Sequence, residues 1–273
     1  MPKVLTEEQV RTFREEGFLT ELGPVYSAAE MKGLDVGMAS LLALLEPGES
    51  SKEIREWHES SRFLYDICMH PAILDPVEDL LGSDFNLWAS NFFIKDPRTS
   101  ESVTWHQDAY YWPLEPIESL TVWLAIDDVD EENGAMEVIP GSHRDGIRPH
   151  NRIEGSADSV LALEAELGNM DPQSAVPICL SAGQFSIHDD QLLHGSPANP
   201  SARRRAGLTV RYSPTHVRND QNVNEHFRVY LARGEDHYGH SPKGVVPEQR
   251  FGRLWRTHLS KDEAGTDDER RAR

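Results

Sequence analysis

The sequence is poor in cysteine and in long apolar runs, and each shortage excludes a class of protein. Cys68 and Cys179 are the only cysteines among 273 residues. Two are too few for a disulfide framework, so we expect reduced thiols in a cytoplasmic protein. No apolar stretch approaches the roughly 20 residues of a membrane-spanning helix, and the first residues lack the apolar run of a signal peptide. The sequence therefore predicts a soluble protein without a membrane partner.

Positive charge is also scarce. The chain has 27 basic and 46 acidic residues and a net charge of −19. Such a surface repels nucleic acid and anionic membranes, although it leaves room for a local basic pocket. The length suits one large domain, which we expect over residues 1–260. Nine of the last 13 residues are charged, so we interpret 261–273 as a disordered tail.

Helix signals occupy the first third of the chain. Thr6 and Gln9 form a capping-box pattern, and Gly17 stops the helix that follows. Ser27 begins a second apolar-periodic stretch that ends before Pro47-Gly48, and Gly82 stops a third. The three helices are expected over residues 7–16, 28–45 and 71–81.

Strand signals dominate from Phe85 onward. Short segments rich in aromatic and β-branched residues are separated by turns such as Asn133-Gly134. Many short strands after a helical layer favour a mainly β protein, a β-sandwich or jelly roll backed by N-terminal helices. Residues 151–177 show no alternation, and we interpret them as an insertion or active-site flap, with a solvated loop as the alternative. The expected strands are Leu87–Ile94, Val103–Asp108, Leu120–Ile126, Ala135–Ile139, Gln184–Ile187 and Gly207–Tyr212.

His106 and Asp108 lie two residues apart in one of these strands. Alternate strand residues share a face, so the imidazole and the carboxylate would project together, roughly 6–7 Å apart at Cα. Two imidazoles and one carboxylate on one face of an octahedron suit non-haem Fe(II) oxygenases. Because His-x-Asp also recurs by chance, this hypothesis requires a third ligand and an anchor for a co-substrate.

His194 is the favoured third ligand. It follows an apolar pair and directly precedes Gly195, as expected for a ligand at the end of a strand. His188 is the rival, because Asp189 and Asp190 beside it could mimic a metal site. We interpret His188 as a surface turn residue.

A 2-oxo acid would serve as co-substrate if its far carboxylate were fixed, and a guanidinium fixes carboxylates with two parallel hydrogen bonds. Arg205 follows His194 by eleven residues. It shares a strand face with the small residues Gly207 and Thr209, which would leave room for a ligand. The alternatives are Arg204, which would lie on the opposite face of the strand, and Arg203 and Arg211, which the alternation of side chains (their parity along the strand) does not exclude.

In this order, His106-x-Asp108, His194-Gly195-Ser196 and Arg205 resemble the phytanoyl-CoA dioxygenase family of Fe(II)/2-oxoglutarate oxygenases. The resemblance covers roughly residues 5–215. It implies a double-stranded β-helix of the cupin type, iron bound by His106, Asp108 and His194, and 2-oxoglutarate bound by Arg205. Strict alternation would point Gln107 away from the metal, unless the strand is bulged. Further segments that match are Gly17-Phe18-Leu19, Asp130–Met136 and Ile139–His143, and the residues that the resemblance places near the co-substrate are Asn91, Gln107, Trp123 and Ser196.

Asp108 bears on the reaction that the resemblance implies. Related halogenases carry a small residue in its place, so its presence favours hydroxylation with Fe(II), 2-oxoglutarate and O2, releasing succinate and CO2. Desaturation and ring formation are alternatives, as are a jelly-roll protein that binds metal without 2-oxoglutarate and a non-catalytic relative. Tyr110-Tyr111-Trp112 could border a small-molecule substrate or pack in the core. We expect a small metabolite or natural product as substrate.

Overall fold

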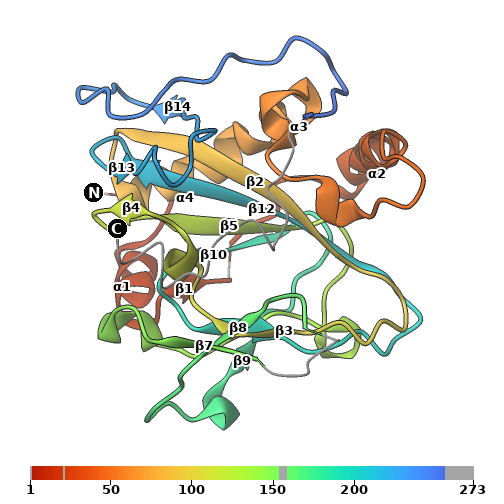
Figure 1. The fold of residues 1–273 in the computed structure, drawn as a ribbon, viewed down its shortest axis with the longest axis vertical. Helices are drawn as coiled ribbons and strands as arrows, with labels where there is room; N and C mark the ends of the chain where they lie inside the picture. Colours follow the sequence, from red (N-terminus) through yellow and green to blue (C-terminus); the bar gives the residue numbers. More distant parts are fainter. Residues whose placement is uncertain (1, 21, 154–158, 256–273) are drawn as a thin grey trace.

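The computed structural model describes residues 2–20, 22–153 and 159–255, and within them two antiparallel sheets face each other (Figure 1). The large sheet contains, in spatial order, β1 (Phe18–Leu19), β10 (Phe185–Asp189), β5 (Leu120–Ala125), β12 (Arg205–Pro214), β2 (Phe85–Lys95) and β14 (Tyr230–Arg233). The small sheet contains β3 (Val103–His106), β11 (His194–Ser196), β6 (Glu137–Val138) and β9 (Val176–Pro177). The expectation of a mainly β protein with N-terminal helices is confirmed.

The helices agree closely with their sequence signals. Thr6 caps α1 (Glu7–Glu16) through a complete capping box, and Gly17 ends it with φ 84°. The bounds of α4 (Pro71–Leu81) are those predicted. Helix α2 (Ala28–Leu42) ends three residues early, because the chain tightens there into i→i+3 hydrogen bonds. A further helix, α3 (Arg62–Cys68), was not predicted; it is only two turns long and its cap is the lone Ser61.

Strand β12 shows why the large sheet separates the core from the site. Its side chains are buried on both faces. Ala206, Leu208, Val210 and Tyr212 face the helices and belong to the main hydrophobic core. That core also includes apolar residues of α2, α3 and α4, so the helices cover the outer face of the large sheet. The Tyr212 hydroxyl donates to the carbonyl of Cys68 at 2.5 Å, which fixes α3 against the sheet.

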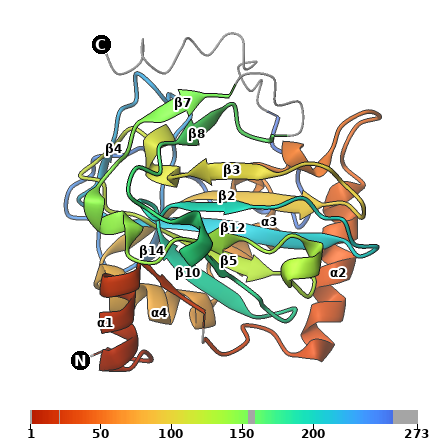
Figure 2. The same ribbon diagram turned by 90° about the horizontal axis from the view of Figure 1, so that it is seen from below.

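The expected bounds of one strand are wrong, and one segment contains strands that the sequence did not indicate. Strand β3 ends at His106, and Asp108 begins a 3-10 turn (Asp108–Tyr111), so the predicted strand Val103–Asp108 is too long. The segment 151–177 is not a plain loop, because β7 (His150–Arg152) pairs with β8 (Leu163–Ala165) and β8 lies beside β3 (Figure 2). Residues 154–158 of that segment and the expected tail 261–273 lie outside the described residues.

Short pairings complete the described fold. β4 (Leu114–Glu115) pairs with β13 (Arg218–Asn219) after the turn that carries Asp108. No helix among the described residues is long and apolar enough to cross a membrane.

Leu208 tests the role of the helix-facing core. Its side chain is fully buried, so Leu208→Ala is expected to lower the free energy of unfolding by about 2–5 kcal/mol through lost burial and a cavity. Urea titration measures the effect. Leu231 on β14, which is 40% exposed, is the matched control, and Leu231→Ala should change stability far less. Equal losses in the two variants would contradict this assignment of the core.

Candidate active site

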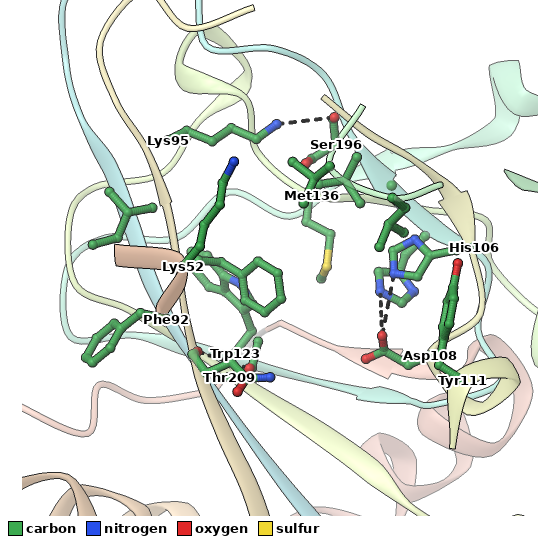
Figure 3. A pocket seen from close by; sticks show the side chains of 18 of the residues that line it. Lys52, Phe92, Lys95, His106, Asp108, Tyr111, Trp123, Met136, Ser196 and Thr209 are labelled. Atoms are coloured by element: carbon green, nitrogen blue, oxygen red, sulfur yellow. Dashed lines mark hydrogen bonds and ion pairs between the residues drawn. The ribbon is translucent and has the colours of Figure 1, made fainter. Parts of the chain in front are cut away.

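A cavity of about 320 Å³ lies between the two sheets. The large sheet lines it with the side chains that alternate with the core residues, including Asn91 of β2, Trp123 of β5 and Arg205 of β12. The small sheet contributes His106 and His194. Figure 3 shows His106, Asp108 and Tyr111 on one side of the cavity, and Lys52 and Lys95 on the other.

His106, Asp108 and His194 form a compact cluster. His106 and His194 are paired opposite each other on β3 and β11. Oδ1 of Asp108 lies 3.5 Å from Nε2 of His106 and 4.0 Å from Nε2 of His194. The possible ligand atoms of all three residues lie within 4.8 Å of one another, so they could hold one metal ion.

The backbone orients both imidazoles. Nδ1 of His106 lies 2.9 Å from the carbonyl of Thr104, and Nδ1 of His194 lies 2.9 Å from that of Leu192. A carbonyl only accepts, so each Nδ1 carries a proton and each Nε2 faces the cluster. Two imidazole nitrogens and one carboxylate oxygen suit a ferrous ion with open coordination positions.

The turn after His106 brings Asp108 to the same side. Gln107 is extended, with φ −118° and ψ 123°, so its two neighbours still project together although strand pairing has ended. The Gln107 side chain donates to the carbonyls of Gly146 and Gln191 and accepts from the backbone N–H of Arg148. Its side chain thus connects two loops. Gln107 is not among the residues that line the cavity, whereas the resemblance implies that it lies near the co-substrate.

Asp108 is held as a carboxylate. Its burial alone would raise its pKa, but Arg211 and the two imidazoles outweigh burial and hold the pKa well below its usual range. Nη2 of Arg211 lies 3.3 Å from Oδ2 of Asp108. This leaves Oδ1 for the imidazole side of the cluster.

The three consecutive arginines have different surroundings. Arg203 is exposed and pairs with Asp130, and Arg204 pairs with Asp127 through two hydrogen bonds of 2.8 Å. Arg205 is buried, lines the cavity and has no carboxylate partner among the described residues. Burial lowers the pKa of the Arg205 guanidinium to about 10, so it stays charged at neutral pH. Of the three, only Arg205 lines the cavity.

Trp123 forms the wall beside Arg205. The guanidinium lies over the Trp123 ring, 5.5 Å from its centre. The ring also covers Gly207, where a Cβ would come within 2.0 Å of it. Gly207 is therefore needed for this close approach. Ser196 and Asn91 line the same cavity.

Three cavity residues escaped the sequence-based prediction in different ways. His188 is buried in β10 and does not lie in a surface turn, because its strand extends to Asp189. Neither of its ring nitrogens has a hydrogen-bond partner among the described residues. Burial lowers the pKa of His188 to about 4. Parity left Arg211 open but gave no reason to choose it. Lys95 gave no signal, since one lysine at the end of a strand is typical of an edge.

The comparisons with known proteins agree with this geometry. The family model described as phytanoyl-CoA dioxygenase (PhyH) matches residues 13–207. The chain therefore belongs to the phytanoyl-CoA dioxygenase family, a family of iron- and 2-oxoglutarate-dependent oxygenases. The predicted cofactors, Fe(II) and 2-oxoglutarate with O2, agree with the relatives below and with the cluster of His106, Asp108 and His194.

Individual relatives are distant. The chain is 27% identical over 225 residues to the probable alpha-ketoglutarate-dependent hypophosphite dioxygenase of Stutzerimonas stutzeri, covering 76% of this chain and 78% of the relative. Other curated relatives are matched over as little as 46% of their length. Among solved structures, the apo non-haem monooxygenase ThoJ is 28% identical with a TM-score of 0.75, covering 89% of each chain. The alpha-ketoglutarate-dependent carbocyclase SnoK, at 23% identity and a TM-score of 0.65, covers 83% of this chain and 92% of its own and shows a shared fold.

Lys95 makes stability depend on pH. Burial, together with the charge of Arg205, lowers its pKa from 10.5 to about 7. Between about pH 7 and 10 the unfolded chain holds a proton at Lys95 that the folded chain has released, so Lys95 makes stability rise with pH across this window. Below about pH 7 the full cost of burying the charge applies.

We therefore expect the free energy of unfolding of Lys95→Met, relative to that of the unaltered protein, to be highest near pH 6 and to fall towards pH 10. Urea unfolding at pH 6 to 10 measures the difference. Lys32→Met on the exposed side of α2 is the control. A stability difference for Lys95→Met that does not change with pH would contradict the prediction.

Proposed function

We propose that this protein is a dioxygenase that hydroxylates a C–H bond of a small organic molecule, with 2-oxoglutarate converted to succinate and CO2. The two facing sheets are then the two halves of a double-stranded β-helix. The observation that carries the proposal is the pairing of a buried His-Asp-His cluster with a buried arginine that has no carboxylate partner among the described residues, in one cavity.

In this proposal His106, Asp108 and His194 bind iron, and Arg205 binds the far carboxylate of 2-oxoglutarate. Bound iron and 2-oxoglutarate would supply the oxidising chemistry with O2. The chain's own residues do the rest. Hydrogen bonds to the backbone orient the imidazoles, Arg211 keeps Asp108 ionised, and Trp123 fixes the plane against which Arg205 lies. The burial of all three proposed ligands keeps bulk water from the reacting atoms.

Asp108 supports hydroxylation over halogenation, because a carboxylate here fills the position that a halide would need. Similar proteins include a probable hypophosphite dioxygenase and a carbocyclase, which indicates that iron chemistry of this kind leads to different outcomes. Ring formation is the second candidate for this chain. A succinate-release screen over amino acids, acyl thioesters and natural-product scaffolds, followed by mass analysis of the product, separates a gain of oxygen from a loss of two hydrogens.

The proposed co-substrate site predicts a spectroscopic signal. Anaerobic titration of Fe(II)-loaded protein with 2-oxoglutarate is expected to produce a metal-to-ligand charge-transfer band in the visible range. Arg205→Met should weaken 2-oxoglutarate binding by about tenfold or more, because it removes charge-assisted hydrogen bonds to a carboxylate. Arg203→Met, which alters an exposed arginine two residues away, is the matched control and should bind 2-oxoglutarate normally.

Two results would contradict these assignments. A well-metallated protein that shows no band would refute the proposed chemistry. Equal losses of iron and 2-oxoglutarate affinity in Arg205→Met would show that Arg205 is not the anchor of the co-substrate.

Asp108→Ala tests the metal site. Loss of one of three ligands is expected to weaken Fe(II) binding and, in buffer without halide, to abolish hydroxylation and to lower succinate formation sharply. Because the variant leaves the Arg211 charge buried without its partner, circular dichroism and thermal unfolding must confirm that it folds. Succinate formation at the normal rate in folded Asp108→Ala protein would refute the role of Asp108 as a ligand.

A further inference from the structure

A second buried guanidinium lies in the cavity, on the same strand face as Arg205. Arg211 follows Arg205 by six residues on β12, which corresponds to about 20 Å along an extended strand. Arg205 is paired with Lys95 in the register of the sheet, whereas Arg211 contacts Asp108. The two arginines therefore stand at opposite ends of the cavity, with the proposed iron ligands beside Arg211.

Arg211 has a hydrogen-bond donor that no described residue satisfies. Its side chain is almost fully buried; Nη2 donates to Asp108 at 3.3 Å, and with the Asn91 amide turned to satisfy both of its neighbours, Nη1 donates to it at 2.9 Å. Nε has no partner among the described residues. A guanidinium has five N–H groups, and a buried N–H group that makes no hydrogen bond costs free energy. Trp112 lies against the guanidinium at 4.5 Å and is itself packed on Trp88, so the group is held rigidly.

The charge of the cavity points in the same direction. Five basic side chains line it against two carboxylates, in a protein whose net charge is −19. The two charges of Fe(II) and those of 2-oxoglutarate cancel, so the cofactors leave this excess of basic groups in place. Arg205 and Arg211 are buried, whereas Arg55 is exposed and Lys52 is partly exposed and paired with Glu101. Burial lowers the pKa of Lys95 to about 7, so Lys95 adds only part of a charge at neutral pH. The field of these groups favours an anionic ligand. The basic residues are Lys52, Arg55, Lys95, Arg205 and Arg211, and the carboxylates are Glu101 and Asp108.

We propose that the prime substrate carries an oxyanion group, a carboxylate or a phosphorus oxyanion, which docks on Arg211. This inference rests on the proposed function, because it takes Arg205 as the anchor of 2-oxoglutarate. Two oxygens of such a group match the paired donors of a guanidinium. Since Arg211 touches a proposed iron ligand, the bond that is oxidised lies within a few bonds of the acid group.

The test uses the anaerobic complex with Fe(II) and saturating 2-oxoglutarate. Acetate and methylphosphonate are the anionic probes, and acetamide and dimethyl methylphosphonate are their neutral counterparts, all at constant ionic strength. Each anion is expected to change the charge-transfer band saturably, and its neutral counterpart is not. The anion that binds more tightly identifies the acid group of the substrate class.

Variants then locate the binding group. In protein fully loaded with Fe(II), Arg211→Met should weaken the binding of the anionic probe at least tenfold and well beyond any loss of 2-oxoglutarate affinity, and Arg211→Lys, which keeps the charge, should retain part of the probe binding. Arg205→Met should show the opposite pattern.

The outcomes separate the two proposals. Absence of the band in the unaltered protein contradicts the proposed function itself. A normal band that responds equally to charged and neutral probes, or that responds unchanged in Arg211→Met, overturns only the present inference. Parallel losses of iron, 2-oxoglutarate and probe binding in Arg211→Met would also overturn it, because they would show that Arg211 serves only to hold Asp108.

Discussion

The alternation of side chains along β12 is the constraint on which the rest of the structure depends. One face carries Leu208 and Tyr212 into the core beneath the helices, and the other carries Arg205 and Arg211 into the cavity. Because the side-chain period of a strand is two, a shift by one residue would bury the arginines among apolar side chains and empty the cavity of its cations. Stability and chemistry are therefore set by one register, which the helices enforce from outside.

Burying charge in this cavity is possible because each charge has a defined neighbour. Asp108 stays ionised through Arg211 and the imidazoles, while Arg205 lies against an aromatic ring instead of an acid. The difference matters, because a guanidinium that gives two hydrogen bonds to one carboxylate, as Arg204 does, has fewer donors for a second carboxylate, whereas Arg211 gives Asp108 only one. Arg204, one residue before Arg205, shows the contrast, because its guanidinium is already paired with Asp127.

Sequence reasoning succeeded where the pattern was local and periodic. The capping box at Thr6, the bounds of α4 and the parity that separated Arg205 from Arg204 follow from helix and strand geometry alone. It failed where tertiary contacts decide. Asp108 leaves its strand because loop residues 146–150 occupy the hydrogen-bonding groups of Gln107, and His188 is buried because β1 and β5 pair with β10 on both sides. Neither contact has a signature within a few residues of the position that it controls.

The acidic composition and the basic cavity are compatible because electrostatic range is short. At physiological ionic strength exposed charges are screened beyond about 8 Å, so the net charge of −19 acts on solubility and on large polyanions rather than on a small molecule at the entrance. There the field is set by Lys52 and Arg55, of which Lys52 is paired with Glu101 at 2.6 Å. Inside the cavity Arg205 and Arg211 are buried, so solvent and salt screen their charges less than they screen exposed charges. An acidic chain can thus still contain a cavity whose buried arginines suit a small anion.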